Sequence, residues 1–232
     1  MSERIEVETP AGAMPAHLWL PSTGRGPGVL LLQEIFGVSP YIRRRAEDLA
    51  ALGYVVLAPE VFWRIGISEI ANGPSMLEEA MAALGRLDWD AAVADSTLAL
   101  EALRARPEVA NGTGVVGFCF GGGLGYAVVA GAPADALVSF YGSTLPNLVE
   151  AVPSVSTPSQ HHFGESDSYI PMDQVTRIRE QVTSGGAPVD FRTYPGADHA
   201  FDNDDFVNHD PVASEQAWSA TTDWLTRTLP TG

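Results

Sequence analysis

The sequence predicts an α/β fold built on a mostly parallel sheet with helices on both faces. Short apolar runs typical of buried strands alternate with amphipathic segments typical of helices. The connections between them are short, which favours parallel strands joined by crossover helices. A chain of 232 residues suits one domain with a sizeable core, and we expect residues 1–232 to form a single domain.

Each element follows from a local pattern. Two extended pieces parted by Pro10-Ala11-Gly12 predict an antiparallel hairpin at a sheet edge, at residues 4–8 and 16–20. After a Gly-rich loop at residues 24–28, apolar runs predict strands at residues 29–32, 54–58, 113–116, 136–140, 159–163 and 189–193. Helices are expected after Ser39-Pro40, at residues 75–84, after Asp88, at residues 124–130, around Val175–Val182 and at the C-terminus. In the helix after Asp88 we expect Trp89, Val93, Leu100 and Leu103 to face inward. In the C-terminal helix we expect Trp218 and Leu225 to face inward. Residues 60–73 form an excursion, and a Pro-containing loop follows residue 140.

Composition and charge exclude several classes of protein. Hydrophobic residues make up 45% and charged residues 18% of the chain, as in an ordinary globular protein. The net charge of −16, from 13 Lys+Arg against 29 Asp+Glu, repels nucleic acid and anionic membranes, so neither is expected as a partner. A single cysteine excludes an internal disulfide. The N-terminus lacks a signal-peptide pattern, and no apolar run approaches the roughly 20 residues of a membrane helix, so we expect a cytoplasmic protein.

The segment Gly117-Phe118-Cys119-Phe120-Gly121 has the layout of a nucleophile elbow. A buried strand precedes it and a helical segment of small residues follows, so Cys119 would lie at the tip of a sharp turn with positive φ. There it would also lie at a helix N-terminus, where free N–H groups and the helix dipole stabilise a thiolate. The alternative is a buried structural cysteine in a Gly-rich turn.

Two further candidates follow later strands of the predicted sheet. Asp167 comes after the strand ending at Phe163, and His199 comes after the last strand. Chemistry in such sheets lies beyond the carboxyl ends of the strands, and nucleophile, acid and histidine is the chain order of α/β-hydrolases. Taken singly, Asp167 could be a turn residue and His199 a surface residue. The match of all three in order favours catalysis over coincidence.

Four segments together resemble the dienelactone hydrolase family. They are Gln33-Glu34-Ile35-Phe36-Gly37-Val38, Gly117-Phe118-Cys119-Phe120-Gly121-Gly122, the Asp167 segment ending in Ile170-Pro171, and Gly196-Ala197-Asp198-His199-Ala200-Phe201. The resemblance covers nearly the whole chain and implies an α/β-hydrolase fold with about eight strands. It implies a Cys-His-Asp triad with Cys119 as nucleophile, His199 as general base and acid, and Asp167 orienting the imidazole. The implied reaction is hydrolysis of an ester or lactone, which a thiol nucleophile would carry out through an acyl-thioester.

Backbone amides near the nucleophile are expected to bind the oxyanion that forms on attack. We expect the N–H of Phe120, directly after Cys119, and that of Ile35, after the strand ending at Gln33, to form this oxyanion hole. The resemblance further implies that Glu34 lies beside the nucleophile and switches its state. A nearby carboxylate would repel a thiolate or accept the thiol's hydrogen bond, and so hold the enzyme unreactive until substrate displaces Glu34. The alternative is a strand-end glutamate pointing to solvent.

The substrate pocket departs from the family pattern. Family members that cleave dienelactone hold its carboxylate with arginines, one of which lies four residues after the catalytic histidine, where this chain has Asn203. Another lies in the helical stretch before the elbow, but residues 65–85 contain no arginine, so only Arg64 or Arg86 could serve from a different place. The aromatic residues near the expected mouth suit a neutral, partly apolar group, with plain core packing as the alternative for each; they are Phe36, Trp63, Tyr141 and Phe201.

Other candidate sites are weaker. His161 and His162 lie on a predicted strand, where successive side chains face opposite ways, and Asp202, Asp204 and Asp205 lack calcium-loop spacing, so no metal and no cofactor are expected. Asp198 is adjacent to His199 and could be mistaken for the triad acid.

We expect a small-molecule ester or lactone as partner and a monomer, with a homodimer as alternative. The rival functions are a carboxylesterase for neutral esters without dienelactone activity, and a non-catalytic protein binding a small ligand on the same fold.

Overall fold

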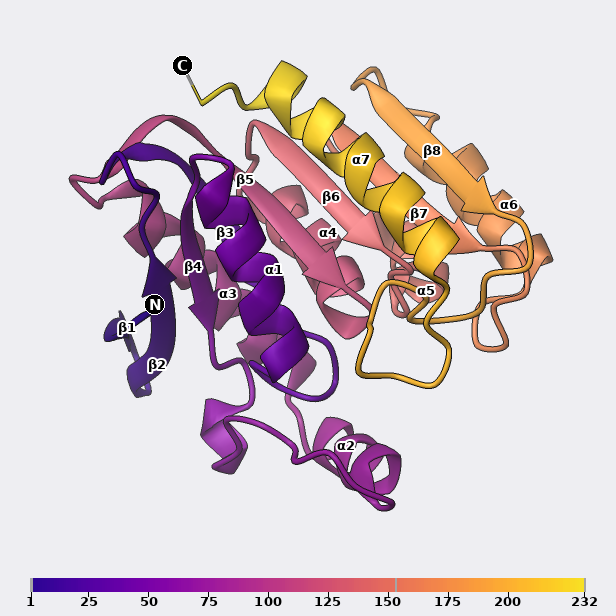
Figure 1. Ribbon diagram of the computed structural model, residues 1–232, viewed down its shortest axis with the longest axis horizontal. Helices are drawn as coiled ribbons and strands as arrows, with labels where there is room; N and C mark the ends of the chain where they lie inside the picture. Colours follow the sequence, from indigo (N-terminus) through magenta and orange to yellow (C-terminus); the bar gives the residue numbers. More distant parts are fainter. Residues whose placement is uncertain (1, 153, 232) are drawn as a thin grey trace. The chain divides into compact units, whose positions relative to one another are not determined.

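The computed structural model describes residues 2–152 and 154–231 (Figure 1). The strands are β1 (Glu3–Thr9), β2 (Gly12–Trp19), β3 (Gly26–Leu32), β4 (Val55–Pro59), β5 (Val109–Phe118), β6 (Ala136–Phe140), β7 (Ser159–Gly164) and β8 (Val189–Tyr194). The helices are α1 (Pro40–Ala51), α2 (Met76–Leu84), α3 (Trp89–Arg104), α4 (Phe120–Gly131), α5 (Leu145–Ala151), α6 (Met172–Val182) and α7 (Pro211–Thr228), with a 3₁₀ turn at Trp63–Ile65. The strand order is β1-β2-β4-β3-β5-β6-β7-β8, which confirms the predicted eight-stranded α/β architecture.

Contacts divide the chain into two compact units. The first runs to Gly114 and includes Thr231, and the second is Val115–Pro230. The division falls within β5, which contributes residues to both units. That the chain is one domain stays a prediction.

The first unit contains the predicted hairpin and two strands buried along their whole length. β1 and β2 pair antiparallel from Glu3↔Leu18 to Thr9↔Gly12, and β3 and β4 pair in parallel. Helix α1 packs on β4 from one side of the strands, while α3 packs from the other (Figure 1). The loop predicted at residues 24–28 was partly wrong, because β3 already begins at Gly26. A side chain at Gly26 would clash with the carbonyl oxygen of Gly53, so this glycine serves close packing instead of a turn.

The second unit contains three parallel strands, β6, β7 and β8, with α4 and α7 packed against them on opposite sides (Figure 1). The strand predicted at residues 136–140 has the predicted bounds. Two expectations were wrong here. Helix α4 begins at Phe120 and not at residue 124, and the Pro-containing loop after residue 140 holds α5, in which Pro146 lies in the first turn. Proline is well tolerated at that position because its missing N–H has no helical partner there.

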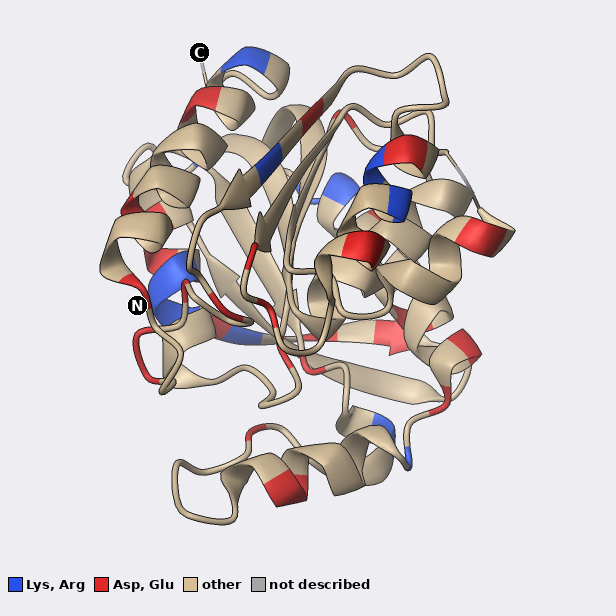
Figure 2. Ribbon diagram, turned by 90° about the vertical axis from the view of Figure 1, so that its right-hand side faces the viewer, with Lys and Arg blue, Asp and Glu red and all other residues tan. Residues whose placement is uncertain are grey.

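The buried faces of two helices differ from the prediction. In α3, Leu100 and Leu103 are buried as predicted, but Trp89 and Val93 are partly exposed, and the buried face also carries the carboxylate of Asp95. In α7, Trp224 is buried while Trp218 is partly exposed. Asp and Glu residues, coloured red in Figure 2, occur on helices and loops throughout the view, in keeping with their excess over Lys and Arg. Among the described residues, no helix combines the length and hydropathy needed to cross a bilayer.

Candidate active site

Cys119 lies on a strained turn between β5 and α4. Its backbone has φ 52° and ψ −115°, a region that residues other than glycine rarely adopt. Backbone hydrogen bonds hold this conformation: the Cys119 N–H donates to the Phe140 carbonyl at 3.0 Å, and its carbonyl accepts from the N–H of Gly122 at 3.0 Å. At Gly117 a side chain would clash with the carbonyl of Gly121, so the turn closes only around glycine. The turn therefore places the Cys119 side chain at the start of α4.

Asp167 and His199 meet because their loops follow neighbouring strands. β7 and β8 are parallel, with Gly164 opposite Tyr194, so both chains leave the sheet side by side. His199 Nδ1 donates to Asp167 Oδ2 at 2.8 Å, and His199 Nε2 lies 3.1 Å from Cys119 Sγ. The second unit thus brings together the three residues of the predicted triad.

The environment of His199 favours its charged form. The side chain is buried, and burial alone would lower its pKa, but the negative charge at Cys119 and the hydrogen bonds with Asp167 and Cys119 outweigh burial. Together they raise the pKa of His199 well above its usual 6.5. An imidazolium in contact with the sulfur stabilises a thiolate, which is the nucleophilic form of cysteine.

Two aromatic rings contact His199, and a third packs against one of them. The ring of Tyr141, a predicted pocket residue, lies 5.2 Å from the imidazole, and the ring of Phe201 lies 5.3 Å from that of Tyr141. Tyr141 and Phe201 are fully buried, which is consistent with core packing as well as with lining a substrate pocket. Sequence reasoning missed Tyr169, whose ring meets His199 edge-on at 5.1 Å and is 55% exposed. Tyr169 could have been predicted as a site residue because it lies only two residues after Asp167, in the same loop.

Of the remaining predicted site residues, Phe120 is the first residue of α4 in the second unit, and the others belong to the first unit. Glu34, Ile35 and Phe36 are buried and follow β3 in a tight turn, in which the Gly37 N–H donates to the Glu34 carbonyl at 3.4 Å. Gly37 has φ 81°, and a side chain there would clash with the Ser68 carbonyl. The roles expected for Glu34, Ile35 and Phe36 beside Cys119 stay predictions.

Arg64 is held by a carboxylate of its own unit. Its Nε and Nη2 donate to the two oxygens of Asp95 at 2.7 and 2.8 Å, and Trp63 Nε1 donates to the same carboxylate at 2.8 Å. Asp95 is buried, so this fork-to-fork pair fixes the excursion after β4 onto α3. Arg86 donates to the carbonyl of Ile65 at 3.1 Å. Asp95 was missed although a carboxylate on the apolar face of a helix is a recognisable signal of a buried ion pair.

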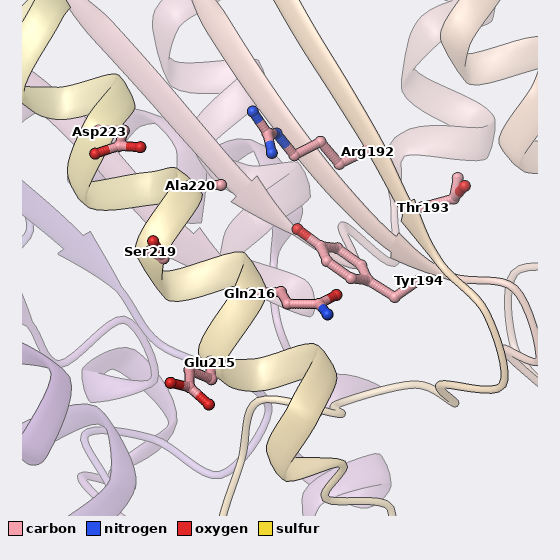
Figure 3. A pocket seen from close by; sticks show the side chains of 8 residues that line it. All are labelled: Arg192, Thr193, Tyr194, Glu215, Gln216, Ser219, Ala220 and Asp223. Carbon is pink, nitrogen blue, oxygen red and sulfur yellow. The ribbon is translucent and has the colours of Figure 1, made fainter.

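A groove of about 580 Å³ lies between β8 and α7 (Figure 3). Its walls are mostly polar and carry Arg192, Gln216 and Asp223, and no predicted site residue lines it. Tyr194, at its edge, has its hydroxyl 2.7 Å from Nδ1 of the buried His162. Within residues 2–152 and 154–231, no three His, Cys, Asp or Glu side chains are grouped as metal ligands would be.

Comparison with known proteins agrees with this architecture. The model of the dienelactone hydrolase family matches residues 14–229. The chain is 32% identical over 228 residues to carboxymethylenebutenolidase 1 from Cupriavidus pinatubonensis, covering 97% of each chain. It is 30% identical over 237 residues to a carboxymethylenebutenolidase from a Pseudomonas species, covering 100% of this chain and 98% of that protein.

A solved structure supports the same assignment. The crystal structure of a putative dienelactone hydrolase from Klebsiella pneumoniae superposes with a TM-score of 0.84 at 25% identity, covering 98% of both chains, which confirms the predicted α/β-hydrolase fold. The match of the family model runs through the segments of Glu34, Cys119, Asp167 and His199. The chain therefore belongs to the dienelactone hydrolase family and is a hydrolase of esters or lactones.

Proposed function

We propose that the protein cleaves a neutral ester or lactone by nucleophilic catalysis, with Cys119 as nucleophile, His199 as general base and acid, and Asp167 as the residue that orients the imidazole. The observation that carries the proposal is the unbroken contact Cys119 Sγ–His199 Nε2–Asp167, at 3.1 and 2.8 Å, on a strained turn at the start of α4. A binding protein has no need of an aligned base and acid, so this contact disfavours the non-catalytic alternative.

The acylation step follows from this geometry. His199 Nε2 takes the proton of the Cys119 thiol, and the thiolate attacks the carbonyl carbon to form a C–S bond. The carbonyl oxygen becomes an oxyanion, for which we propose the N–H groups of Phe120 and Ile35 as donors. The C–O bond then breaks, and His199 returns the proton to the leaving oxygen.

Deacylation repeats the same proton transfers with water. His199 takes a proton from water, the hydroxide attacks the acyl-thioester, and the C–S bond breaks to release the acid. The thiolate leaves beside an imidazolium, which its raised pKa favours. The role of Asp167 in both steps is to hold one tautomer of His199 and to stabilise the imidazolium.

A neutral substrate is proposed because the available arginines are engaged. Both nitrogens of the Arg64 fork that face Asp95 are occupied, and Arg86 bonds a backbone carbonyl. Asn203, at the position of the missing arginine, accepts a hydrogen bond from the N–H of Asp205 at 2.9 Å. A substrate carboxylate without a cationic partner would be costly to desolvate. We therefore expect simple esters to be cleaved faster than dienelactone.

The compartment and assembly are part of the proposal. We propose a cytoplasmic monomer that works on a small substrate, because the lone cysteine gains nothing from an oxidising compartment and the acidic surface repels other polyanions. Sedimentation equilibrium at micromolar protein should give the mass of one chain, and a twofold mass would favour the homodimer.

The first test compares p-nitrophenyl acetate and a dienelactone as substrates of wild type and Cys119→Ala. Hydrolysis of the neutral ester that vanishes in Cys119→Ala supports the thiol hydrolase. A folded wild type with no Cys119-dependent activity on either compound would falsify the proposal and favour the binding protein. Faster turnover of the dienelactone than of the ester would overturn the neutral-substrate assignment alone.

Substitution of Glu34 separately tests how the Cys119 thiol is kept unreactive before substrate binds. We propose that Glu34 holds Cys119 as a thiol before substrate arrives, and because Sγ here contacts His199, this would require a second rotamer of Cys119. Alkylation by iodoacetamide should then be slow in wild type and several-fold faster in Glu34→Ala. Glu60→Ala, at another buried glutamate of the first unit, is the control. Equal rates in wild type and Glu34→Ala would refute the switch.

A further inference from the structure

Two loops carry the acid and the base, and their backbones are joined directly. The acid loop (residues 165–171) follows β7, and the histidine loop (residues 195–203) follows β8. The N–H of Glu165 donates to the Tyr194 carbonyl at 3.0 Å, and that of Ser166 donates to the Ala197 carbonyl at 2.9 Å. The loops therefore approach each other before either side chain of the acid–base pair is reached.

Two carboxylates link the same two loops, one from each loop to the other. Asp167, in the acid loop, reaches across to the His199 ring and accepts from the N–H groups of Tyr169 and Ile170 at 2.8 and 2.9 Å. Asp198, in the histidine loop, reaches back with Oδ1 to the Ser168 N–H at 2.9 Å and also accepts from the His199 N–H at 2.6 Å. Each loop thus contributes one carboxylate that accepts hydrogen bonds from backbone N–H groups next to Asp167 and His199.

The backbone of His199 is constrained on both sides. Its N–H is held by Asp198, and its carbonyl accepts from Asn208 Nδ2 at 3.1 Å. The next residue, Ala200, has φ 60°, a conformation that costs free energy in a residue other than glycine and persists only where the surroundings impose it. The direction in which the imidazole leaves the chain depends on these constraints.

We propose that Asp198 is a positioning residue: by binding the amides of Ser168 and His199 together, it sets the imidazole to reach Asp167 and Cys119 at once. The inference rests on the proposed function of His199. Asp198 does not act as the triad acid, because Nδ1 of His199 is bonded to Asp167. Burial raises the pKa of Asp198, but the backbone hydrogen bonds from Ser168 and His199, a side-chain hydrogen bond with Ser168 and the charge of His199 together lower the pKa below its usual value, so Asp198 is a carboxylate at neutral pH.

The test compares Asp198→Ala with Asp198→Asn. Asparagine keeps an acceptor oxygen for both amides, whereas alanine removes it, so the two variants separate loss of hydrogen bonds from loss of charge. With p-nitrophenyl acetate, kcat of Asp198→Ala should fall roughly 10–100-fold at nearly constant KM, as expected for a displaced catalytic group. Asp198→Asn should recover most of the loss. Glu165→Ala is the matched control, since this acid-loop carboxylate accepts a hydrogen bond from Thr193 Oγ1, away from the His199 ring, and its loss should leave kcat unchanged.

A spectroscopic measurement keeps the test independent of turnover. The hydrogen-bonded Nδ1 proton of His199 should give a low-field NMR resonance, assigned by its loss in His199→Ala. That resonance should persist in Asp198→Asn and in Glu165→Ala, and should shift upfield or vanish in folded Asp198→Ala. If wild type lacks esterase activity, the proposed function fails while the resonance still tests the positioning role. A kcat of Asp198→Ala within twofold of wild type, equal impairment of both Asp198 variants, or loss of the resonance in Asp198→Asn would overturn the inference.

Discussion

At the scale of single residues, Asp167 divides its oxygens between two tasks. Oδ1 accepts from two backbone N–H groups of its own loop, and Oδ2 accepts from His199. In Asp167→Asn the amide oxygen can keep the backbone bonds, but the NH₂ group then faces Nδ1 and forces the imidazole into the wrong tautomer. We expect kcat to fall by roughly 10²–10⁴-fold with little change in Tm.

The control for this prediction is Glu165→Gln, which makes the same chemical change in the same loop. Its kcat should stay within about twofold of wild type, because surface charges away from the reacting atoms have small effects. A kcat of Asp167→Asn within threefold of wild type would show that His199 does not depend on Asp167.

The order of chemical residue types in the sequence predicted which side chains meet. Cys119, Asp167 and His199 each follow a strand of the predicted sheet, and parallel strands bring their carboxyl ends to one edge, so the meeting of the three needed no contact information. The positioning role proposed for Asp198 was not predicted, because its partners are backbone N–H groups, which every residue except proline carries. Asp95 escaped notice because helical periodicity assigns its face to apolar side chains, and its partners lie about 30 residues earlier, at Trp63 and Arg64.

At the scale of elements, the turn between β5 and α4 depends on how closely two backbone segments approach. A methyl group at Gly117 would clash with the Gly121 carbonyl. We expect Gly117→Ala to lower the free energy of unfolding by about 1–3 kcal/mol, the usual cost of overpacking, and to reduce kcat because the strand and the helix must separate. Chemical denaturation and ester hydrolysis measure the two effects.

Gly131→Ala, at the last residue of α4, is the matched control. A methyl group at Gly131 would have no described atom within 4 Å, and alanine favours a helix by about 0.5–1 kcal/mol relative to glycine. Activity should be unchanged and stability equal or higher. Equal effects of the two substitutions would mean that close approach at Gly117 is unimportant.

Apolar periodicity predicted the strands better than the helix ends. β6 has the predicted bounds, and all eight strands were expected, the first two from the turn that parts them and the other six from their apolar runs. The start of α4 was misplaced because its first residues are three glycines after Phe120, which are poor helix formers in isolation; tertiary packing overrides that preference. The short α5 has one turn of buried contacts, too few to give a periodic signal.

At the scale of the whole molecule, two neutral histidines in the core make stability depend on pH. Burial lowers the pKa of His161 to about 4 and that of His162 well below its usual 6.5, with Arg192 and His161 adding to the shift at His162. In the unfolded chain each of these histidines binds a proton below about pH 6.5, whereas in the folded chain His161 binds one only near pH 4. The free energy of unfolding is therefore highest above pH 6.5 and falls as the pH drops towards 4, by up to about 3 kcal/mol for His161 alone.

The variant His161→Phe isolates this contribution. The ring lies among Tyr126 and Phe191, so an aromatic replacement keeps the packing while removing the titrating group. Urea unfolding at pH 7 and pH 4.5 should show a smaller loss of stability on acidification in the variant than in wild type. The change in net charge with pH is nearly the same in both proteins, so it does not mask the difference. Parallel losses would mean that His161 is not a neutral core residue.

The lone cysteine also ties the lifetime of the protein to the redox chemistry of its surroundings. Peroxide converts a reactive thiolate to a sulfenic acid, which many proteins rescue by forming a disulfide with a second cysteine. Cys119 is the only cysteine in the sequence, so no such rescue exists within one chain. Cys119 is also buried, with 8% of its surface exposed, which slows repair by small thiols from solution. Oxidative damage to this protein is therefore reversed only as fast as a reducing partner reaches the sulfur, and the next oxidation step is irreversible.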